Sequence, residues 1–220
     1  MATSTTSSTI LAGATGLVGS ACLRLLLADP VFGRITVLTR RPLPAALREP
    51  DTAGRLDERM VDFAELEALP DGVRWIVCAL GTTIRKAGSR ARFREVDYDY
   101  PLRLAELGLA QGARHFLLVS ALGANSRSRF FYNRVKGELE QALLALPYRS
   151  ITILRPSLLV GPRSEFRPAE ALGQRLGFLF PASARPVAAS AVAAALVSAA
   201  REDRPGQSII PSAEIRARFG

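Results

Sequence analysis

The stretch LAGATGLVGS, residues 11–20, carries three glycines spaced three residues apart, Gly13, Gly16 and Gly19. The apolar run TILA (9–12) leads into the glycines, and the helix-forming run ACLRLLLA (21–28) follows the stretch. In a dinucleotide-binding βαβ unit, glycines here allow a tight turn, the approach of a pyrophosphate to the backbone, and close helix–sheet packing. The N–H groups that begin such a helix also attract phosphate. We therefore expect a phosphate-binding turn between a strand and a helix.

The glycine spacing G-x-x-G-x-x-G differs from the commoner G-x-G-x-x-G of dehydrogenases, and a glycine motif alone is weak evidence. The alternative interpretation is an ordinary turn between a strand and a helix. The context favours the dinucleotide site, because a second strand, RITVLT (34–39), follows the helix as a βαβ unit requires. Apolar residues at helical spacing predict the buried face of that helix: Val18, Cys22, Leu25 and Leu26.

Segments typical of strands and of helices alternate along the chain. Apolar or β-branched runs predict strands at 9–12, 34–39, 59–62, 73–80, 115–120, 150–156 and 207–210. Helical patterns lie at 16–28, 63–69, 89–113, 128–146, 169–180 and 187–200. This order predicts an α/β fold, a Rossmann-like doubly wound parallel sheet with helices on both faces and a small C-terminal substrate-side extension.

The domain organisation expected from these patterns is simple. We interpret residues 1–8 as a disordered tail and 9–220 as a single domain, with 157–220 as its small C-terminal, substrate-side part. Pro101 falls inside the predicted helix 89–113 and should kink or divide it. Ser128 is a candidate N-cap for the predicted helix 128–146.

The residues that end the second predicted strand bear on the choice of cofactor. An acidic residue there would hold the ribose 2′-OH of NAD, but this chain has Arg40 and Arg41 instead. Guanidinium groups suit a 2′-phosphate, so we expect NADP(H) to be preferred over NAD(H). The alternative is a pair of exposed arginines at a strand end. Asp62, after the third strand, could meet the adenine edge or cap the next helix.

The sequence YNRVK places Tyr132 and Lys136 four residues apart on a predicted helix, and therefore on one helix face. A neighbouring ammonium stabilises a tyrosine phenolate, which makes Tyr132 a usable general acid/base. The pair follows the fifth predicted strand, about twelve residues after Ser120 at its end. A Y-x-x-x-K match also arises by chance, so the alternative is a core aromatic residue beside a surface lysine.

Composition restricts the class of protein. The 220 residues, with 48% hydrophobic and 22% charged, suit one globular domain. No apolar run reaches the roughly 18 residues of a membrane span, and MATSTTSST lacks the features of a secretory signal, so we expect a cytoplasmic protein. Cys22 and Cys78 lie in apolar runs and are expected to be buried free thiols. With one histidine and no ligand spacing, no metal site is expected.

The net charge of +9 comes almost entirely from arginine. Such a charge raises the question of nucleic-acid binding, but no recognition motif accompanies it. The densest cluster, RKAGSRARFR (85–94), is interpreted as a solvated loop, with an anionic cofactor or a protein or nucleic-acid partner as alternatives. We expect no nucleic-acid partner.

Six blocks of the chain together resemble the short-chain dehydrogenase/reductase superfamily, in its atypical NAD(P)-binding branch. The resemblance is closer to the family of the HIV Tat-interacting oxidoreductase and its bacterial relatives. The blocks are GATGLVG (13–19), CALGTTIRKAG (78–88), FREVDYDY (93–100), HFLLVSALGAN (115–125), FYNRVKGELE (131–140) and LRPSLLVGPR (154–163). They cover about residues 9–165, and LGTT-x-x-KAG and Y-x-x-x-KGE-x-E are more specific than the glycine motif.

The resemblance implies an NADP(H) site in which Arg40 meets the 2′-phosphate and the segment from Pro156 passes near the nicotinamide. It implies that Tyr132 and Lys136 form the catalytic pair and that Lys136 also donates a hydrogen bond to the nicotinamide ribose. The pyrophosphate and ribose positions implied are Gly13, Thr15, Gly16, Leu17, Val18, Gly19, Leu80, Gly81 and Thr82.

Two positions depart from the pattern of the superfamily. Ser120 matches the serine that holds the substrate carbonyl, but if that serine belongs later, Ala121 or Leu122 takes its place. Asp97 stands where many relatives have asparagine. We interpret Asp97 as an ordinary helix acid, with a water-holding role as the alternative.

Three functions remain from these observations. The first is an NADP(H)-dependent oxidoreductase acting on a small-molecule carbonyl or alcohol, with Tyr132, Lys136 and Ser120 as its catalytic residues. The second is an NADPH-binding redox sensor or regulatory scaffold that acts through a protein partner. A sugar-nucleotide epimerase ranks lower, because only about 60 residues follow Pro156. We expect no membrane partner, and either a monomer or a homodimer.

Overall fold

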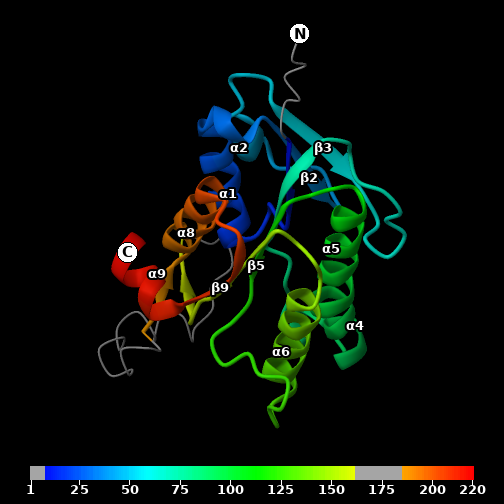
Figure 1. The fold of residues 1–220 in the computed structure, drawn as a ribbon, viewed down its shortest axis with the longest axis vertical. Helices are drawn as coiled ribbons and strands as arrows, with labels where there is room; N and C mark the ends of the chain where they lie inside the picture. The colour runs from blue at the N-terminus through cyan, green and yellow to red at the C-terminus, as the bar shows by residue number, and fades with distance from the viewer. Residues whose placement is uncertain (1–7, 162–184) are drawn as a thin grey trace.

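The computed structural model describes residues 8–161 and 185–220, and its centre is a seven-stranded sheet (Figure 1). The strands are β1 (Ser8–Ala12), β2 (Arg34–Thr39), β3 (Leu56–Met60), β4 (Val73–Cys78), β5 (His115–Val119), β6 (Ser150–Arg155) and β9 (Gly206–Pro211). Their order is β3-β2-β1-β4-β5-β6-β9, and all neighbouring pairs are parallel. Strands β2 and β3 are added on one side of β1, and β4, β5, β6 and β9 on the other. Such sheets bind ligands at this switch point between β1 and β4.

Both faces of the sheet are buried, which accounts for the nearly continuous apolar sequences of its central strands. In β4, Trp75 and Val77 join the core cluster on one face, whereas Ile76 and Cys78 join the cluster on the other. The alternation follows from the period of two along a strand. Each face therefore needs a helical layer to cover it.

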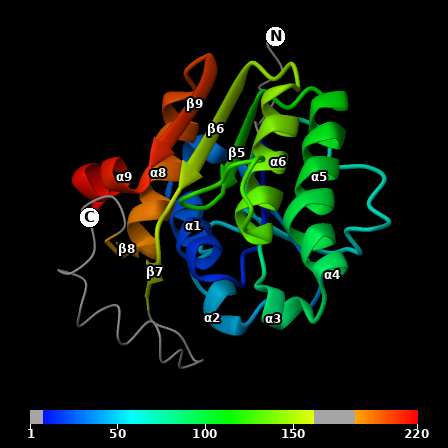
Figure 2. The same cartoon turned by 90° about the horizontal axis from the view of Figure 1, so that it is seen from below.

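Figures 1 and 2 show these two layers. α1 (Leu17–Ala28) and α8 (Ala189–Glu202) pack side by side on one face, and α5 (Tyr100–Ala110) and α6 (Phe131–Leu144) cover the other. The shorter elements are a 3-10 turn (Pro30–Phe32), α2 (Ala45–Arg48), α3 (Ile84–Ala87), α4 (Arg90–Arg94), β7 (Leu159–Val160), β8 (Val187–Ala188) and α9 (Ser212–Phe219). β7 and β8 pair in a separate two-stranded sheet.

The predicted α/β, doubly wound Rossmann-like sheet is confirmed, with helices on both faces. Of the predicted C-terminal part 157–220, α8 and β9 belong to the central sheet and its helical layer. Residues 1–7 of the predicted tail and the predicted helix 169–180 lie outside the described residues, and Ser8 already belongs to β1.

The predicted helix 63–69 is wrong, because this stretch forms neither helix nor strand. The backbone of residues 63–69 is instead bound by side chains of α5 and of the turn that follows α5. Arg103 donates to the carbonyl of Leu66 at 2.6 Å, and the side-chain oxygen of Gln111 accepts from the N–H of Leu69 at 2.9 Å. The apolar residues of the segment are thus buried without helical hydrogen bonds.

Two further details of the predicted helices are wrong. Leu25 of α1 is 37% exposed, and the buried face includes Leu23 and Leu27 instead. α6 begins at Phe131, three residues after the predicted N-cap. Ser128 instead accepts a hydrogen bond from the N–H two residues later, at 3.1 Å, in the turn that leads into the helix.

The predicted helix 89–113 is interrupted, as Pro101 led us to expect. A π-helical segment, Glu95–Asp99, separates α4 from α5, and the N–H of Tyr100 bonds to the carbonyl of Glu95 five residues earlier. Pro101 has no N–H to give to the carbonyl of Asp97, and its ring crowds that carbonyl. The helix therefore widens by one residue next to Asp97.

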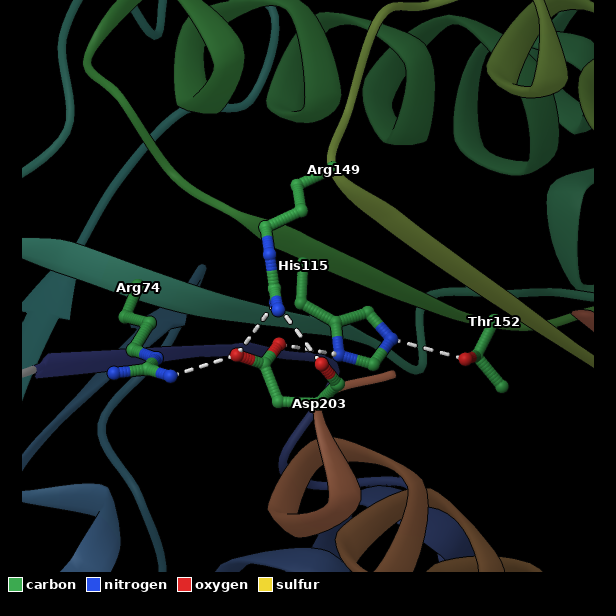
Figure 3. A network of polar contacts seen from close by, with 5 residues as sticks. All are labelled: Arg74, His115, Arg149, Thr152 and Asp203. Carbon is green, nitrogen blue, oxygen red and sulfur yellow. Dashed lines mark hydrogen bonds and ion pairs between the residues drawn. The ribbon is translucent and has the colours of Figure 1, made fainter. Parts of the chain in front are cut away.

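At the amino ends of the strands, a partly buried polar network ties the end of α8 to the sheet (Figure 3). Asp203, with a φ of 44°, ends α8, and its carboxylate meets Arg74 at 2.7 Å and Arg149 at 2.9 Å. His115 Nδ1 is 3.4 Å from the other carboxylate oxygen, and His115 Nε2 is 2.9 Å from Thr152 Oγ1. Burial lowers the pKa of His115 to about 4 despite the neighbouring Asp203, so the ring is neutral at pH 7.

Candidate functional site

A cavity of about 500 Å³ lies at the carboxyl ends of β1, β4 and β5, at the switch point of the sheet. Its walls come from the turn after β1, the segment after β4, the end of β5 and the first turns of α6. The lining residues are Thr15, Gly16, Leu17, Val18, Ser20, Ala79, Leu80, Gly81, Thr82, Thr83, Lys86, Asp97, Val119, Ser120, Tyr132, Lys136 and Leu159.

The glycines of the first turn are explained by close backbone contacts. Gly13 has a φ of +88°, and a Cβ there would lie 2.4 Å from the carbonyl oxygen of Ala79. A Cβ on Gly19 would lie 2.1 Å from the carbonyl oxygen of Gly13, so α1 packs directly on the turn. Gly16 is the N-cap of α1 and supplies no side-chain cap, which leaves the N–H groups of the first helical turn beside the cavity.

Tyr132 and Lys136 lie together on α6 and line this same cavity. The ring of Tyr132 packs against Phe93, with ring centroids 5.5 Å apart. Lys136 is only 3% exposed, and its ammonium lies 2.7 Å from a carboxylate oxygen of Asp97. Burial lowers the pKa of Lys136, but the charge of Asp97 and its hydrogen bond to the lysine outweigh burial, so the pKa is raised and Lys136 is an ammonium.

Ser120 borders the cavity, but its hydroxyl is engaged on the other side. It donates to a carboxylate oxygen of Glu140, which is 2% exposed and also ion-paired with Arg155. The single proton of a hydroxyl cannot serve a second acceptor at the same time. Ala121 and Leu122, which follow Ser120, carry no hydroxyl. The carbonyl-holding role of Ser120 thus stays a prediction, and this hydrogen bond disfavours it.

The residues expected around the adenosine surround the carboxyl ends of β2 and β3. Arg40 and Arg41 directly follow β2 and are exposed. Within residues 8–161 and 185–220, neither guanidinium has a carboxylate partner. Asp62, just beyond β3, accepts a hydrogen bond from the N–H of Ala64 at 2.9 Å. Asp62 therefore closes a turn, and no helix follows it.

The remaining predicted positions lie close to this cavity. Leu80, Gly81 and Thr82 line it directly after β4. Pro156 is buried and is not among the residues that line the cavity, and its carbonyl accepts from the N–H of Leu122 at 2.8 Å. The fold thus brings the glycine turn, the segment after β4 and the Tyr132–Lys136 pair to one place.

Comparison with known proteins decides the family of this chain. A family profile described as NAD(P)H-binding matches residues 13–203. The protein HTATIP2 of Rattus norvegicus is 36% identical over 171 residues, 76% of this chain and 69% of that protein. The chain belongs to this NAD(P)H-binding family. Another member, protein fmp52 of Emericella nidulans, is named mitochondrial and is 36% identical over 167 residues, 74% of this chain and 72% of that protein.

Several solved structures share the fold of this NAD(P)H-binding protein. MoeE5, in complex with UDP-glucose and NAD, aligns with a TM-score of 0.71 at 17% identity, over 92% of this chain and 74% of that chain. The UDP-Glc/GlcNAc 4-epimerase of Campylobacter jejuni aligns with a TM-score of 0.69 at 14% identity, over 96% and 82%. At these identities the likeness concerns the fold alone. No helix in the described residues is long and apolar enough to cross a bilayer.

The geometry of the cavity fits the nicotinamide dinucleotide that this family binds. A Cβ would fill the close approaches at Gly13 and Gly19, and the first turn of α1 has no side-chain cap beside the cavity. The volume of about 500 Å³ is within the range of small-molecule sites, about 300–1,000 Å³. Gly16 and Thr82 would hold the phosphate and ribose sides, and Lys136 the nicotinamide end.

Two acids of this site were missed or undervalued from the sequence. Asp97 is fully buried, and it bonds Lys136 and the backbone N–H of Thr82 rather than serving as an ordinary helix acid. The nearby Pro101, which deforms the helix, was a signal that could have marked it. Glu140 lies in the same quoted block as Tyr132, but nothing in its spacing indicated that it would hold Ser120.

Proposed function

We propose that this NAD(P)H-binding protein is an NADP(H)-dependent oxidoreductase that interconverts a carbonyl compound and its alcohol, with Tyr132 as general acid/base. One observation carries the proposal. Tyr132 shares a cavity with the glycine turn and with Lys136, a buried ammonium held by a carboxylate. An aromatic residue in the core beside a surface lysine would show neither the burial of Lys136 nor the shared cavity.

The side chains divide the chemistry between them. The nicotinamide, when bound, gives a hydride to a carbonyl carbon or takes one from an alcohol carbon. Tyr132 gives its hydroxyl proton to the carbonyl oxygen during reduction and takes it back during oxidation. The ammonium of Lys136 stabilises the phenolate that forms, and its three N–H donors also leave a bond for the ribose.

The preference for NADP(H) rests on the two arginines after β2. Arg40 and Arg41 are exposed, and within the described residues no carboxylate neutralises them. A 2′-phosphate at this end of the sheet would gain charge-assisted hydrogen bonds, whereas a 2′-OH would gain much less. A cytoplasmic location is a separate prediction.

A binding role without turnover is the second candidate, and the position of Ser120 favours it. The hydroxyl of Ser120 donates its hydrogen bond to Glu140, so of Ser120 and Tyr132 only Tyr132 would be left to donate to a carbonyl oxygen. A redox sensor or scaffold needs the cofactor cavity but no donor to a substrate. In that role, the protein would present its NADPH-bound surface to a protein partner.

Turnover with a panel of aldehydes and ketones separates the two candidates. We expect NADPH oxidation by the wild type and a loss of at least about a hundredfold in Tyr132→Phe, the size of a general-acid contribution. Tyr98→Phe is the matched control, because it removes a hydroxyl from a ring that packs against Arg94 outside the cavity. Equal rates in wild type and Tyr132→Phe would contradict the catalytic role of Tyr132.

A further inference from the structure

We propose that Asp97 is a positioning residue that fixes the ammonium of Lys136 at the cofactor cavity and ties it to the segment after β4. The proposal rests on the proposed function, because it concerns the residue pair that would perform the proton transfer. It assigns to Asp97 a direct contact with Lys136, instead of the surface position of an ordinary helix acid.

The two oxygens of Asp97 serve two different segments. One lies 2.7 Å from Lys136 Nζ on α6, and the other accepts from the N–H of Thr82 at 2.8 Å. Asp97 and Lys136 are 0% and 3% exposed, so water does not screen their contact. The carboxylate therefore joins two segments that line the cavity, α6 and the segment after β4.

The local backbone explains why this acid points inward. Asp97 belongs to the π-helical segment Glu95–Asp99, and the missing N–H of Pro101 leaves its carbonyl without the usual helical partner. Gly81 lies directly over the pair, because a Cβ there would be 3.5 Å from Asp97 and 3.9 Å from Lys136. The absence of a side chain at residue 81 leaves the ion pair open to the cavity.

The charge of Lys136 depends on few neighbours. The groups that face its ammonium are Asp97 from the π-helical segment, Tyr132 from α6 and Cys78 from β4. Burial raises the pKa of Cys78 to about 11, so this thiol is neutral at pH 7. Asp97, 2.7 Å away, is then the acid that opposes the cost of burying Lys136. Without it, burial would favour the neutral amine.

Lysine NMR tests this proposal directly, because the chain contains only two lysines, Lys86 and Lys136. Protein labelled with ¹³C at lysine Cε gives two signals, which a Lys86→Arg variant assigns. We expect the Lys136 signal of the wild type to stay at its ammonium position between pH 7 and 10. In Asp97→Asn, which keeps an acceptor for Thr82 but loses the charge, we expect Lys136 to lose its proton within that range.

Asp99→Asn is the matched control, since it makes the same change on an exposed residue of the same segment, and it should behave as the wild type. Identical Lys136 titration in the wild type and Asp97→Asn would overturn the proposal. So would loss of the Lys136 proton below pH 10 in the wild type, which decides the question even if Asp97→Asn does not fold.

NADPH titration of the same proteins distinguishes a failure of the Asp97 proposal from a failure of the proposed function. We expect Asp97→Asn to bind NADPH about tenfold more weakly, the effect of one weakened charged hydrogen bond, and Asp99→Asn to bind it unchanged. An unchanged affinity in Asp97→Asn would count against the positioning role. A wild type that does not bind NADPH would refute the proposed function, while the lysine titration would still judge Asp97.

Discussion

At the scale of single residues, the absence of a side chain decides the shape of the cofactor turn. A Cβ added at Gly13 or Gly19 would lie 2.4 or 2.1 Å from a backbone carbonyl oxygen, closer than real Cβ atoms come. Gly16 is different, because its nearest neighbour would lie 3.3 Å from an added Cβ and its φ is negative. The three glycines of one motif thus have different tasks: two allow packing, and one leaves the helix start uncapped.

We predict that Gly19→Ala destabilises the protein by at least about 1–3 kcal/mol, the usual cost of overpacking, because its methyl group meets the rigid carbonyl of Gly13. Gly16→Ala should lose much less stability, since the carbonyl need move only a few tenths of an ångström. Urea unfolding of both variants measures the difference. Equal stability of Gly19→Ala and Gly16→Ala would contradict the packing described for the turn.

At the scale of elements, an acidic residue connects neighbouring elements at each end of the sheet. At the cofactor end, the π-helical segment Glu95–Asp99 directs a buried acid toward α6. At the amino ends of the strands, Asp203 joins the end of α8 to β4 and β5 through Arg74 and His115. The Asp203 network lies away from the cavity and holds the end of α8 against the sheet.

This network predicts a pH dependence of stability. The pKa of His115 is lowered from 6.5 to about 4 in the folded protein, so the unfolded chain binds the proton more tightly. The stabilisation is therefore present above pH 6.5 and is lost as the pH falls toward 4. The shift corresponds to about 3 kcal/mol of unfolding free energy.

Urea unfolding at pH 7, 5.5 and 4 checks this prediction, with His115→Asn as the reference that cannot take up the proton. The wild type should lose about 3 kcal/mol more than His115→Asn between pH 7 and 4. Parallel loss of stability in the two proteins would show that His115 does not titrate as described.

How far the sequence predicts this protein differs between its elements. The alternation of apolar runs and helical patterns predicted the sheet, because parallel strands buried on both faces leave a strong signal in β4 and β5. The prediction of a helix at 63–69 was wrong, since side chains of α5 and of the turn after it bind that backbone and local propensity could not reveal this. Tyr132 and Lys136 were predicted from their spacing on one helix and from their position after the fifth predicted strand. The partner of Lys136 was not, because its inward direction depends on a helix distortion that Pro101 imposes.

At the scale of the whole molecule, the two halves of the sheet would supply the two ends of one ligand. The β1–β2–β3 half presents Arg40 at its carboxyl edge, and the β4–β5–β6 half presents Lys136 and Tyr132 beside the cavity. The glycine turn lies between them at the switch point. A dinucleotide with a 2′-phosphate would therefore contact both halves and stabilise the folded state by mass action.

Thermal unfolding with NADPH, with NADH and without cofactor tests this central claim most directly. At about a hundredfold excess over the dissociation constant, NADPH should add about 2.7 kcal/mol, a shift in melting temperature on the order of 5–10 °C. We predict a smaller shift with NADH, and a loss of the difference in Arg40→Ala but not in Arg34→Ala, at the other end of β2. Equal shifts with NADPH and NADH would contradict the role of Arg40, and no shift with either would contradict the cofactor site itself.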